Sequence, residues 1–293
     1  MKDTHQTSFA LPVNRILNED CIAGMRALPE RSVDLIIADP PYNLSKGGDW
    51  KWDNSIVLSG MGGNWNKVMQ DWDNFTFESY IGFTHAWLRE AKRILRPTGS
   101  MWIFGTYHNI GIINVICQQL DIEIINEIVW YKRNAFPNLS GRRLTASHET
   151  ILWCHNGGKK REYYFDYAYS KNGDFEGDGL KTPEKQMRTV WDIPNNKESS
   201  ELQFGKHPTQ KPLKILKRMI RLSSKAGDTV LAPFAGAGSE CVAAKMTGRN
   251  YIGFEVDEAY CGIAEERLQH TEEEHQQLTL ALLSSTEKTN PEE

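Results

Sequence analysis

The stretch that decides the fold is DTVLAPFAGAGS, residues 228–239. Its first part, Asp228–Ala232, has the apolar character of a short buried strand, and the residues from Gly238 to Thr247 have the pattern of a helix. Between them, Gly236 and Gly238 form a strand-to-helix turn where a ligand can approach the backbone, because no side chain stands in the way. We therefore expect a strand–turn–helix unit with a ligand site at its turn.

An acidic residue follows this turn at an informative distance. Glu255 ends the next predicted strand, Asn250–Glu255, 17 residues after Gly238. A carboxylate at that place can accept hydrogen bonds from both hydroxyls of a ribose. The dinucleotide fingerprint needs a third glycine where this chain has Cys241, so the pattern favours a nucleoside cofactor without a pyrophosphate. S-adenosylmethionine fits this description; the alternative is that the glycines only satisfy packing.

Other apolar runs extend the pattern in both directions. They predict strands over Ser32–Ala38, Ser100–Gly105, Ile122–Tyr131 and His148–Cys154. Amphipathic stretches predict further helices over Phe77–Leu95, Leu213–Ser223 and Glu258–Gln269. Alternating strands and helices are typical of an α/β, Rossmann-like fold, with a mostly parallel twisted sheet and helices on both faces.

The composition is that of an ordinary globular protein. The 293 residues are 40% hydrophobic and 25% charged, which excludes a disordered chain, a collagen-like fibre and a disulfide-stapled miniprotein. The formal net charge of −4 hides a division. Residues 1–131 carry a net charge of −4, residues 132–225 carry +9, and residues 226–293 carry −9. Only the middle segment has the charge that a nucleic-acid partner would require.

Cysteine usage and hydropathy indicate the compartment. The five cysteines are never spaced as CxxC, which supports neither a zinc site nor a disulfide framework. Residues 1–12 lack the apolar core of a signal peptide, and no run approaches 18 consecutive apolar residues. We expect a soluble cytoplasmic protein that binds neither a metal nor a membrane.

The most specific motif is Asp39-Pro40-Pro41-Tyr42, directly after a predicted strand. Two prolines fix the backbone, so that the Asp39 carboxylate and the Pro40 carbonyl can face the crevice at the strand's carboxyl end. They offer two acceptors for one exocyclic amino group, and Tyr42 offers a face on which its ring can stack. The alternative is a rigid strand exit capped by Asp39. No Pro-Cys pair is present to attack a cytosine ring carbon.

Two segments depart from the alternation. Residues 43–74 are rich in Gly, Trp, Asn and Asp, and their length predicts a mobile loop of the kind that is usually a lid, a binding loop or a disordered segment. Residues 156–205 are basic and rich in aromatics, which suits either a nucleic-acid surface or a solvated insertion with its own small core. The acidic tail from Thr271 is expected to fray.

Together these motifs resemble the beta class of site-specific DNA amino-methyltransferases, in which the DPPY motif precedes the cofactor motif. The resemblance runs from about Asn14 to Leu268. The stretches that carry it are NEDC (18–21), ADPPYN (38–43), HETILW (148–153), HPTQKP (207–212) and PFAGAGS (233–239). Bacterial adenine methyltransferases that act on GATC or GANTC sites are the most similar. The resemblance implies a circularly permuted methyltransferase fold with a target-recognition insertion.

The resemblance also implies roles for individual residues. The target base is held by Asp39, Pro40, Pro41 and Tyr42. S-adenosylmethionine, with S-adenosylhomocysteine as product, is bound with Asp20 at the adenine amino group, Glu255 at the ribose and residues 209–211 near the methionine end. The whole predicted cofactor set is Asp20, Cys21, Asp39, Thr209, Gln210, Lys211, Phe234, Ala235, Gly236, Gly238, Ser239, Glu255 and Val256. The candidate DNA contacts in the basic middle segment are Arg142, Arg143, Lys159, Lys160 and Arg161.

The implied organisation is one methyltransferase domain interrupted by its recognition segment. The catalytic half covers 14–155, the insertion 156–205, the cofactor-binding half 206–270 and the acidic tail 271–293. The expected partner is DNA with a short adenine-containing site, flipped out of the duplex for reaction. A homodimer and a cognate restriction endonuclease are further possible partners.

Several alternatives remain open from the sequence. Cytosine-N4 methylation uses the same fold, usually with Ser at the position of Asp39; an RNA or protein methyltransferase more often has Asn-Pro-Pro-Tyr. A DNA-binding module with vestigial catalysis is a further option. Relatives usually have Asp where this chain has Ala232, which predicts weaker cofactor affinity unless Asp39 or water serves the cofactor's ammonium group instead.

Overall fold

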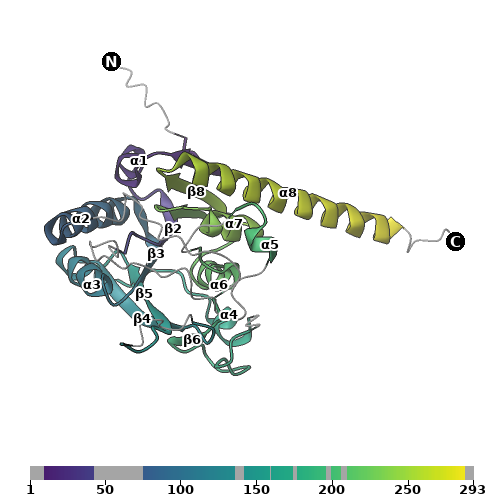
Figure 1. Cartoon of the computed structure of the whole chain (residues 1–293). Coiled ribbons are helices and arrows are strands. Elements are labelled where there is room, and N and C mark those ends of the chain that lie inside the picture. The colour runs from purple at the N-terminus through teal and green to yellow at the C-terminus, as the bar shows by residue number, and fades with distance from the viewer. Residues whose placement is uncertain are drawn as a thin grey trace, which may run out of the picture.

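A single eight-stranded sheet forms the centre of the molecule (Figure 1). The computed structural model describes residues 10–42, 75–135, 142–158, 160–173, 177–195, 199–205 and 210–287, with the side chains of 200 and 273–287 left aside. The strand order is β1-β8-β7-β2-β3-β5-β4-β6. The strands are β1 Arg15–Asn18, β2 Val33–Ala38, β3 Leu95–Gly105, β4 Glu123–Tyr131, β5 His148–His155, β6 Val190–Asp192, β7 Thr229–Ala232 and β8 Asn250–Glu255.

Neighbouring strands are parallel except at β5, which is antiparallel to both β3 and β4. The predicted mostly parallel sheet is therefore confirmed. The helices are α1 Cys21–Ala27, α2 Phe77–Ile94, α3 Ile110–Gln119, α4 Tyr167–Asn172, α5 Ser199–Leu202, α6 Leu213–Ser223, α7 Ser239–Met246 and α8 Glu258–Glu287.

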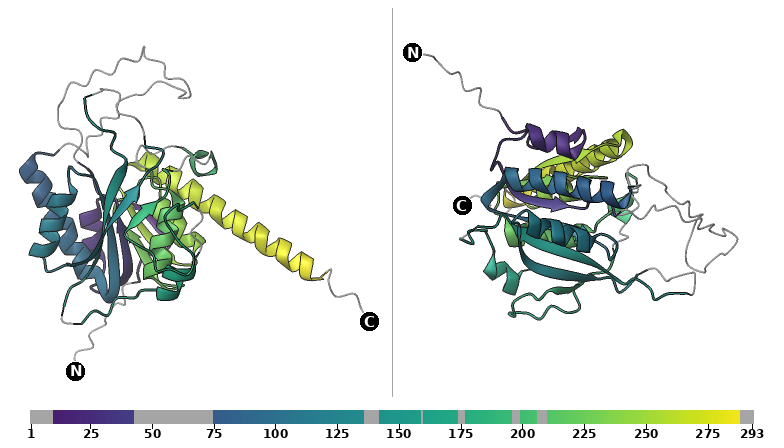
Figure 2. Two further views of the ribbon diagram at one scale, coloured as in Figure 1. Left: turned by 90° about the horizontal axis from the view of Figure 1, so that it is seen from below. Right: turned by 90° about the vertical axis from the view of Figure 1, so that its left-hand side faces the viewer.

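The helices form a layer on each face of the sheet, as the perpendicular views in Figure 2 show. Strand β2 illustrates why: its residues alternate between the two faces, so Leu35 and Ile37 join one core cluster while Ile36 and Ala38 join the other. Helices α1, α2 and α3 supply the second cluster, and α6, α7 and the start of α8 supply the first. A central strand buried on both faces explains the continuous apolar run at residues 33–38.

The C-terminal helix is longer than expected. Fraying was expected from Thr271, but α8 continues to Glu287 and extends away from the sheet (Figure 1). The expectation was wrong because the segment consists largely of good helix formers, and because Glu272 pairs with Lys245 of α7 at 2.8 Å.

The aromatic segment after β5 does not form the separate small core that was one of the two predictions for it. Tyr163, Phe165 and Tyr169 pack against the main core, where the rings of Tyr163 and Phe165 each lie 5.5 Å from that of Trp153. Further along, β6 pairs with β4 and brings buried Trp191 to the sheet. The described part of 156–205 therefore has no small core of its own. Tyr167 is 54% exposed, and the role of the segment as a nucleic-acid surface stays a prediction.

Some residues singled out in the sequence analysis are not described by the structure. These are residues 43–74, Lys159 and Thr209. All five cysteines are buried free thiols. None of the helices in the described ranges has both the length and the apolar character that a membrane crossing requires.

Candidate active site

The site lies where the connections of the sheet change direction. Strand β7 leads through α7 to β8, whereas its neighbour β2 leads through α2 to β3, and α7 and α2 lie on opposite faces. Because β2, β7 and β8 are parallel, the residues that follow their last positions, Asp39, Pro233 and Val256, emerge at one edge. A crevice at such a switch point is where open α/β sheets bind ligands.

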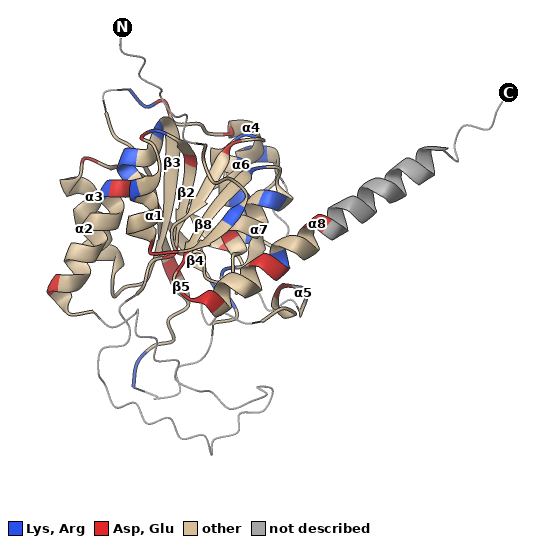
Figure 3. Cartoon of the chain, turned by 90° about the horizontal axis from the view of Figure 1, so that it is seen from above, with Lys and Arg blue, Asp and Glu red and all other residues tan. Residues whose placement is uncertain are grey.

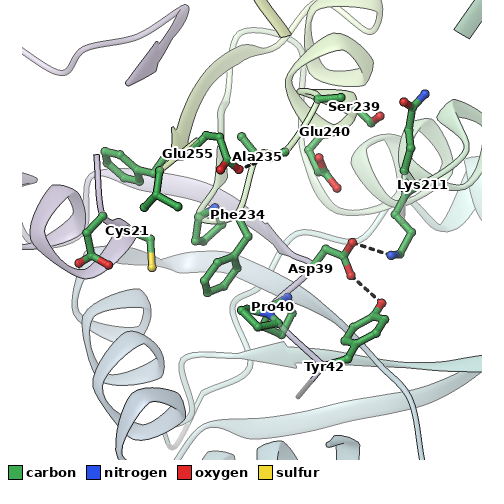
Figure 4. A pocket seen from close by; sticks show the side chains of 18 of the residues that line it. Cys21, Asp39, Pro40, Tyr42, Lys211, Phe234, Ala235, Ser239, Glu240 and Glu255 are labelled. Carbon is green, nitrogen blue, oxygen red and sulfur yellow. Dashed lines mark hydrogen bonds and ion pairs between the residues drawn. The ribbon is translucent and has the colours of Figure 1, made fainter. Parts of the chain in front are cut away.

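A pocket of about 360 Å³ occupies this edge (Figure 4). It joins the glycine turn to the Asp-Pro-Pro-Tyr corner in one continuous cavity. Most of the predicted cofactor and base-binding residues line it: Asp20, Cys21, Asp39, Pro40, Pro41, Tyr42, Gln210, Lys211, Phe234, Ala235, Gly236, Ser239, Glu255 and Val256. The structure thus brings together residues that are up to 236 positions apart in the chain.

Glu255 holds the glycine turn in place. Its Oε2 accepts a hydrogen bond from the Gly236 amide at 2.7 Å, and its Oε1 accepts one from the Asp257 amide at 2.9 Å. Burial raises the pKa of Glu255, and these amide donors oppose that effect. The carboxylate still faces the pocket, because oxygens that accept one bond each retain further lone pairs.

Gly238 has a clear conformational role in the turn. It has a φ of +74°, and a Cβ built on it would lie 2.7 Å from the Ala264 Cβ. The residue must be glycine because the backbone is left-handed and α8 packs directly against it. Its predicted contact with the cofactor stays a prediction.

Asp20 and Cys21 line the pocket, and Cys21 lies on the side away from Lys211 (Figure 4). Asp20 caps α1, where its Oδ1 accepts hydrogen bonds from the amides of Ile22 and Ala23 at 3.1 and 3.0 Å. Its side chain is exposed at the pocket, so the predicted contact with an adenine amino group stays a prediction. Burial raises the pKa of the Cys21 thiol, which keeps it neutral and makes it an apolar part of the wall.

An aromatic wall stands beside the glycine turn. The Phe234 ring lies 5.5 Å from Trp87 in an edge-to-face arrangement and 6.0 Å from Phe83. Phe75 stacks on Phe83 at 5.0 Å and also lines the pocket. The α2 contribution was missed from the sequence, where Phe83 is only one residue of an amphipathic helix.

The Asp-Pro-Pro-Tyr corner forms polar contacts with residues on both faces of the sheet. Asp39 Oδ1 accepts a hydrogen bond from the Tyr42 hydroxyl at 2.6 Å, and Asp39 Oδ2 forms an ion pair with Lys211 Nζ at 2.5 Å (Figure 4). On the other side, the Tyr80 hydroxyl donates to the Pro41 carbonyl at 2.9 Å. Lys211 was predicted near the methionine end of the cofactor, which stays a prediction; the structure pairs it with the Asp39 carboxylate.

A second acid–base pair completes the cluster. Glu149, at the start of β5, accepts a hydrogen bond from the Tyr42 hydroxyl at 3.4 Å and lies 3.9 Å from Lys211 Nζ. Its other oxygen pairs with Lys132. The sequence motif HETILW contains Glu149, but nothing in the sequence assigned it or Lys132 to the site.

Burial and pairing set the protonation of this cluster. Burial alone would lower the pKa of Lys211, but the carboxylates of Asp39 and Glu149 raise it above its usual value. Burial raises the pKa of Asp39, assisted by Glu149 and opposed by Lys211. For Glu149, the cations of Lys211 and Lys132 outweigh burial and lower the pKa. Lys211 is therefore a permanent cation between two carboxyls, of which Asp39 accepts a proton more readily.

The candidate DNA contacts divide between two edges of the sheet. Exposed Arg142 and Arg143 precede β5, and Arg143 donates to the Tyr107 hydroxyl at 3.1 Å. Lys160 and Arg161 follow the eight-residue strand, which spans about 26 Å at 3.3 Å per residue. Because β5 is antiparallel to β3, only its start lies at the site edge. Arg161 also pairs with Glu123. Arg142 and Arg143 therefore lie at the site edge, whereas Lys160 and Arg161 lie at the other edge, and DNA contact by any of them stays a prediction.

Basic residues elsewhere are equally dispersed. Figure 3 shows Lys and Arg on elements of both layers in the described part of the chain, often beside Asp or Glu. Arg218, for example, is buried and pairs with Asp178 at 2.7 Å. Among the described residues of 132–225, Arg218 therefore does not contribute to a basic surface.

Fold and pocket together define the class: an α/β protein with a mostly parallel sheet and a pocket that joins a strand–glycine–helix turn to an Asp-Pro-Pro-Tyr corner. The comparisons agree with this class. Residues 33–266 match the DNA methylase family model, and the chain belongs to the DNA methylase family.

Two relatives show the similarity at the level of sequence. The chain is 41% identical over 261 residues to the type II methyltransferase M.HinfI of Haemophilus influenzae, a match that covers 87% of this chain and 68% of the relative. It is 40% identical over 256 residues to the type II methyltransferase M2.DpnII of Streptococcus pneumoniae, covering 87% and 89%. Among solved structures, the Thermus thermophilus protein TTHA0409 complexed with S-adenosyl-L-methionine matches with a TM-score of 0.58 and 25% identity, over 88% of this chain and 95% of that one.

Proposed function

We propose that this DNA methylase transfers a methyl group from S-adenosylmethionine to the N6 amino group of adenine in a short DNA site. The observation that carries the proposal is the single pocket between Glu255 with its glycine turn and Asp39 with its ion pair. One end offers carboxylates and amides for a nucleoside, and the other offers acceptors for an amino group.

The described residues fit S-adenosylmethionine. Asp20 and Cys21 would hold the adenine, Glu255 the ribose, and the walls formed by Phe234 and Ala235 the apolar surface between them. The Gln210 side-chain oxygen is buried without a hydrogen-bond partner among the described residues, and it lines the end where the methionine portion would lie. When bound, the cofactor supplies an electrophilic sulfonium methyl group.

The chain's own residues prepare the target nitrogen. An adenine amino nitrogen is a poor nucleophile because its lone pair is delocalised into the ring. Hydrogen bonds from that amino group to Asp39 and to the Pro40 carbonyl favour a nitrogen with a localised lone pair. Positioning and electrostatics then carry the rate, without a covalent intermediate.

Lys211 and Tyr42 hold the Asp39 carboxylate in one orientation for this task. The raised pKa of Asp39 suits it to accept the proton that the amino group loses after transfer. Since the amino group is buried in duplex DNA, the nucleotide must first be flipped out, at a cost of a few kcal/mol.

DNA would lie along the site edge of the sheet. There Asn134 and Asn195 exchange hydrogen bonds of 2.9 and 2.7 Å and join the segment after β4 to the segment after β6. Arg142 and Arg143 lie at the same edge, before β5. We infer that base recognition involves these two segments, of which the one after β6 belongs to the proposed insertion, with phosphate contacts from the two arginines.

The decisive experiment is transfer of a tritiated methyl group to plasmid DNA, followed by nucleoside digestion. N6-methyladenine is the expected product, and N4-methylcytosine would replace the proposal with its main alternative, which the Asp at position 39 disfavours. Asp39→Ala should abolish labelling while S-adenosylmethionine still binds in a titration. Labelling retained by this variant would refute the assignment of Asp39.

The biological setting follows from the kind of relative. Because both relatives are named type II methyltransferases, we infer that this protein modifies a restriction site whose cognate endonuclease it protects against. Long-read mapping of modified adenines would give the site, and digestion of modified plasmid with matching restriction enzymes would test protection. The predicted homodimer is testable by sedimentation in the presence and absence of DNA.

A further inference from the structure

One buried acid of the pocket has no task in the mechanism above. Glu240 lies in the first turn of α7, lines the pocket and is 4% exposed. Figure 4 shows its carboxylate pointing into the cavity between the glycine turn and Asp39. Among the described residues, no other side chain forms a hydrogen bond or an ion pair with its carboxylate, which interacts with its own backbone amide. A buried carboxylate without such a partner is costly, so it is expected where a ligand provides one.

The protonation of Glu240 is consistent with a cationic ligand. Burial, assisted by Asp39, raises the pKa of Glu240 to about 8, while Lys211 and Arg267 act in the opposite direction. Without a ligand the carboxyl is therefore mostly neutral near pH 7. A cation placed beside it would lower the pKa and turn the interaction into a charged hydrogen bond.

The arrangement of the pocket residues indicates which cationic group of the ligand lies beside Glu240. Glu255, the ribose position, lies between the Cys21 end and the Glu240 end in Figure 4. With the base toward Cys21 and the reactive methyl group toward Asp39, the amino-acid portion must extend toward Glu240. Asp39 is already paired with Lys211 and is assigned to the target amino group, and Ala232 offers no carboxylate. Glu240 is left as the acid available to an ammonium group.

We propose that Glu240 binds the α-ammonium group of the methionine portion of S-adenosylmethionine. This inference rests on the proposed function, since it assumes that cofactor. It assigns the recognition of the amino-acid end to a residue of the α7 turn.

Three ligands separate the inference from its alternatives in a calorimetric titration. S-adenosylmethionine and S-adenosylhomocysteine both carry the ammonium group, whereas methylthioadenosine lacks it. Glu240→Gln should weaken the binding of the first two ligands by about ten- to hundredfold and leave the affinity for methylthioadenosine unchanged. Glu258→Gln, which removes an exposed carboxylate outside the pocket wall, serves as the matched control and should change none of them.

Proton release gives a second readout that a purely structural role would not affect. Wild-type protein should release a proton on binding S-adenosylmethionine near pH 7, because Glu240 ionises, and affinity should rise with pH toward about 8. Titrations in two buffers of different ionisation enthalpy measure this release. The Glu240→Gln variant should lose that component while its melting temperature stays equal or rises.

Other outcomes overturn the inference. Equal weakening of all three ligands would mean that Glu240 only shapes the pocket, and weakening of S-adenosylmethionine alone would place the residue at the sulfonium. Unchanged affinities would also reject it. A wild-type protein that binds none of the three would refute the proposed function itself, which distinguishes that failure from a failure of this inference.

Discussion

Substitution of Lys211 by methionine tests the core of the catalytic cluster. The Lys211 side chain is 3% exposed, and its Nζ lies 2.5 Å from Asp39 and 3.9 Å from Glu149. Methionine keeps the length and apolar stem but removes the charge. Glu149 retains its ion pair with Lys132, so Asp39 alone loses its principal cation.

The size of the loss in unfolding free energy depends on whether Asp39 takes up a proton once Lys211 is replaced. Breaking a buried ion pair by removing one partner costs about 3–5 kcal/mol. Asp39 can limit the cost by taking up a proton, which for a carboxyl of ordinary pKa costs about 5 kcal/mol at pH 7.5 but only about 2 kcal/mol at pH 5.5. Its pKa in the variant is raised above the unfolded value, so stability is lost as pH rises. We expect a deficit of about 3–5 kcal/mol at pH 7.5 that shrinks to about 2 kcal/mol at pH 5.5.

Urea unfolding at pH 5.5, 6.5 and 7.5 measures this deficit. Lys214→Met is the matched control, because Lys214 is exposed on the same helix, and it should stay within about 0.5 kcal/mol of the parent protein. The double variant Lys211→Met/Asp39→Asn should recover most of the loss and all of its pH dependence. A deficit for Lys211→Met below about 1 kcal/mol, or one independent of pH, would refute the reasoning.

Three further predictions concern the turn, the cofactor and DNA. Gly238→Ala should lower the free energy of unfolding by about 2–4 kcal/mol in a denaturant titration, because an alanine there needs a left-handed backbone and overlaps α8; an unchanged midpoint would contradict this. Glu255→Ala should weaken S-adenosylmethionine at least about tenfold, since it removes the carboxylate that faces the ribose and holds the Gly236 amide; full affinity in the titration would remove Glu255 from the cofactor site. Arg143→Ala should reduce the salt slope of DNA binding by about one in fluorescence anisotropy, whereas Arg161→Ala at the opposite edge should leave it unchanged. If Arg161→Ala reduced the slope and Arg143→Ala did not, DNA would bind at the edge opposite to the one that we propose.

Local patterns predicted most of the fold. The strands β2, β7 and β8 and the helix α6 lie where apolar runs and amphipathic periodicity placed them, within a residue or two. These elements are long or sharply bounded, so their signals are strong. The four-residue strand β1 and the three-residue strand β6 were missed, because segments so short carry too little periodicity and form through pairing with β8 and β4.

The site was predicted in part, for a similar reason. The sequence identified Asp39, Tyr42 and Glu255, which belong to compact motifs with recognisable neighbours. It did not identify Glu149 or Glu240, whose importance depends on what lies opposite them. Nor could it show that Tyr163, Phe165 and Tyr169 pack against the main core, since the same residues suit a stacking surface equally well.

The sequence by itself determined the chemistry that is available: a strand–glycine–helix turn, an acid 17 residues later and an Asp-Pro-Pro-Tyr corner after a buried strand. Turn stereochemistry and strand burial are local, so residue order is enough to specify them. Only the tertiary structure decided which groups meet. The Lys211–Asp39 ion pair joins residues 172 positions apart, and the antiparallel insertion of β5 sends Arg142 and Arg161 to opposite edges. Such outcomes depend on strand order and direction, which arise from the packing of the whole sheet.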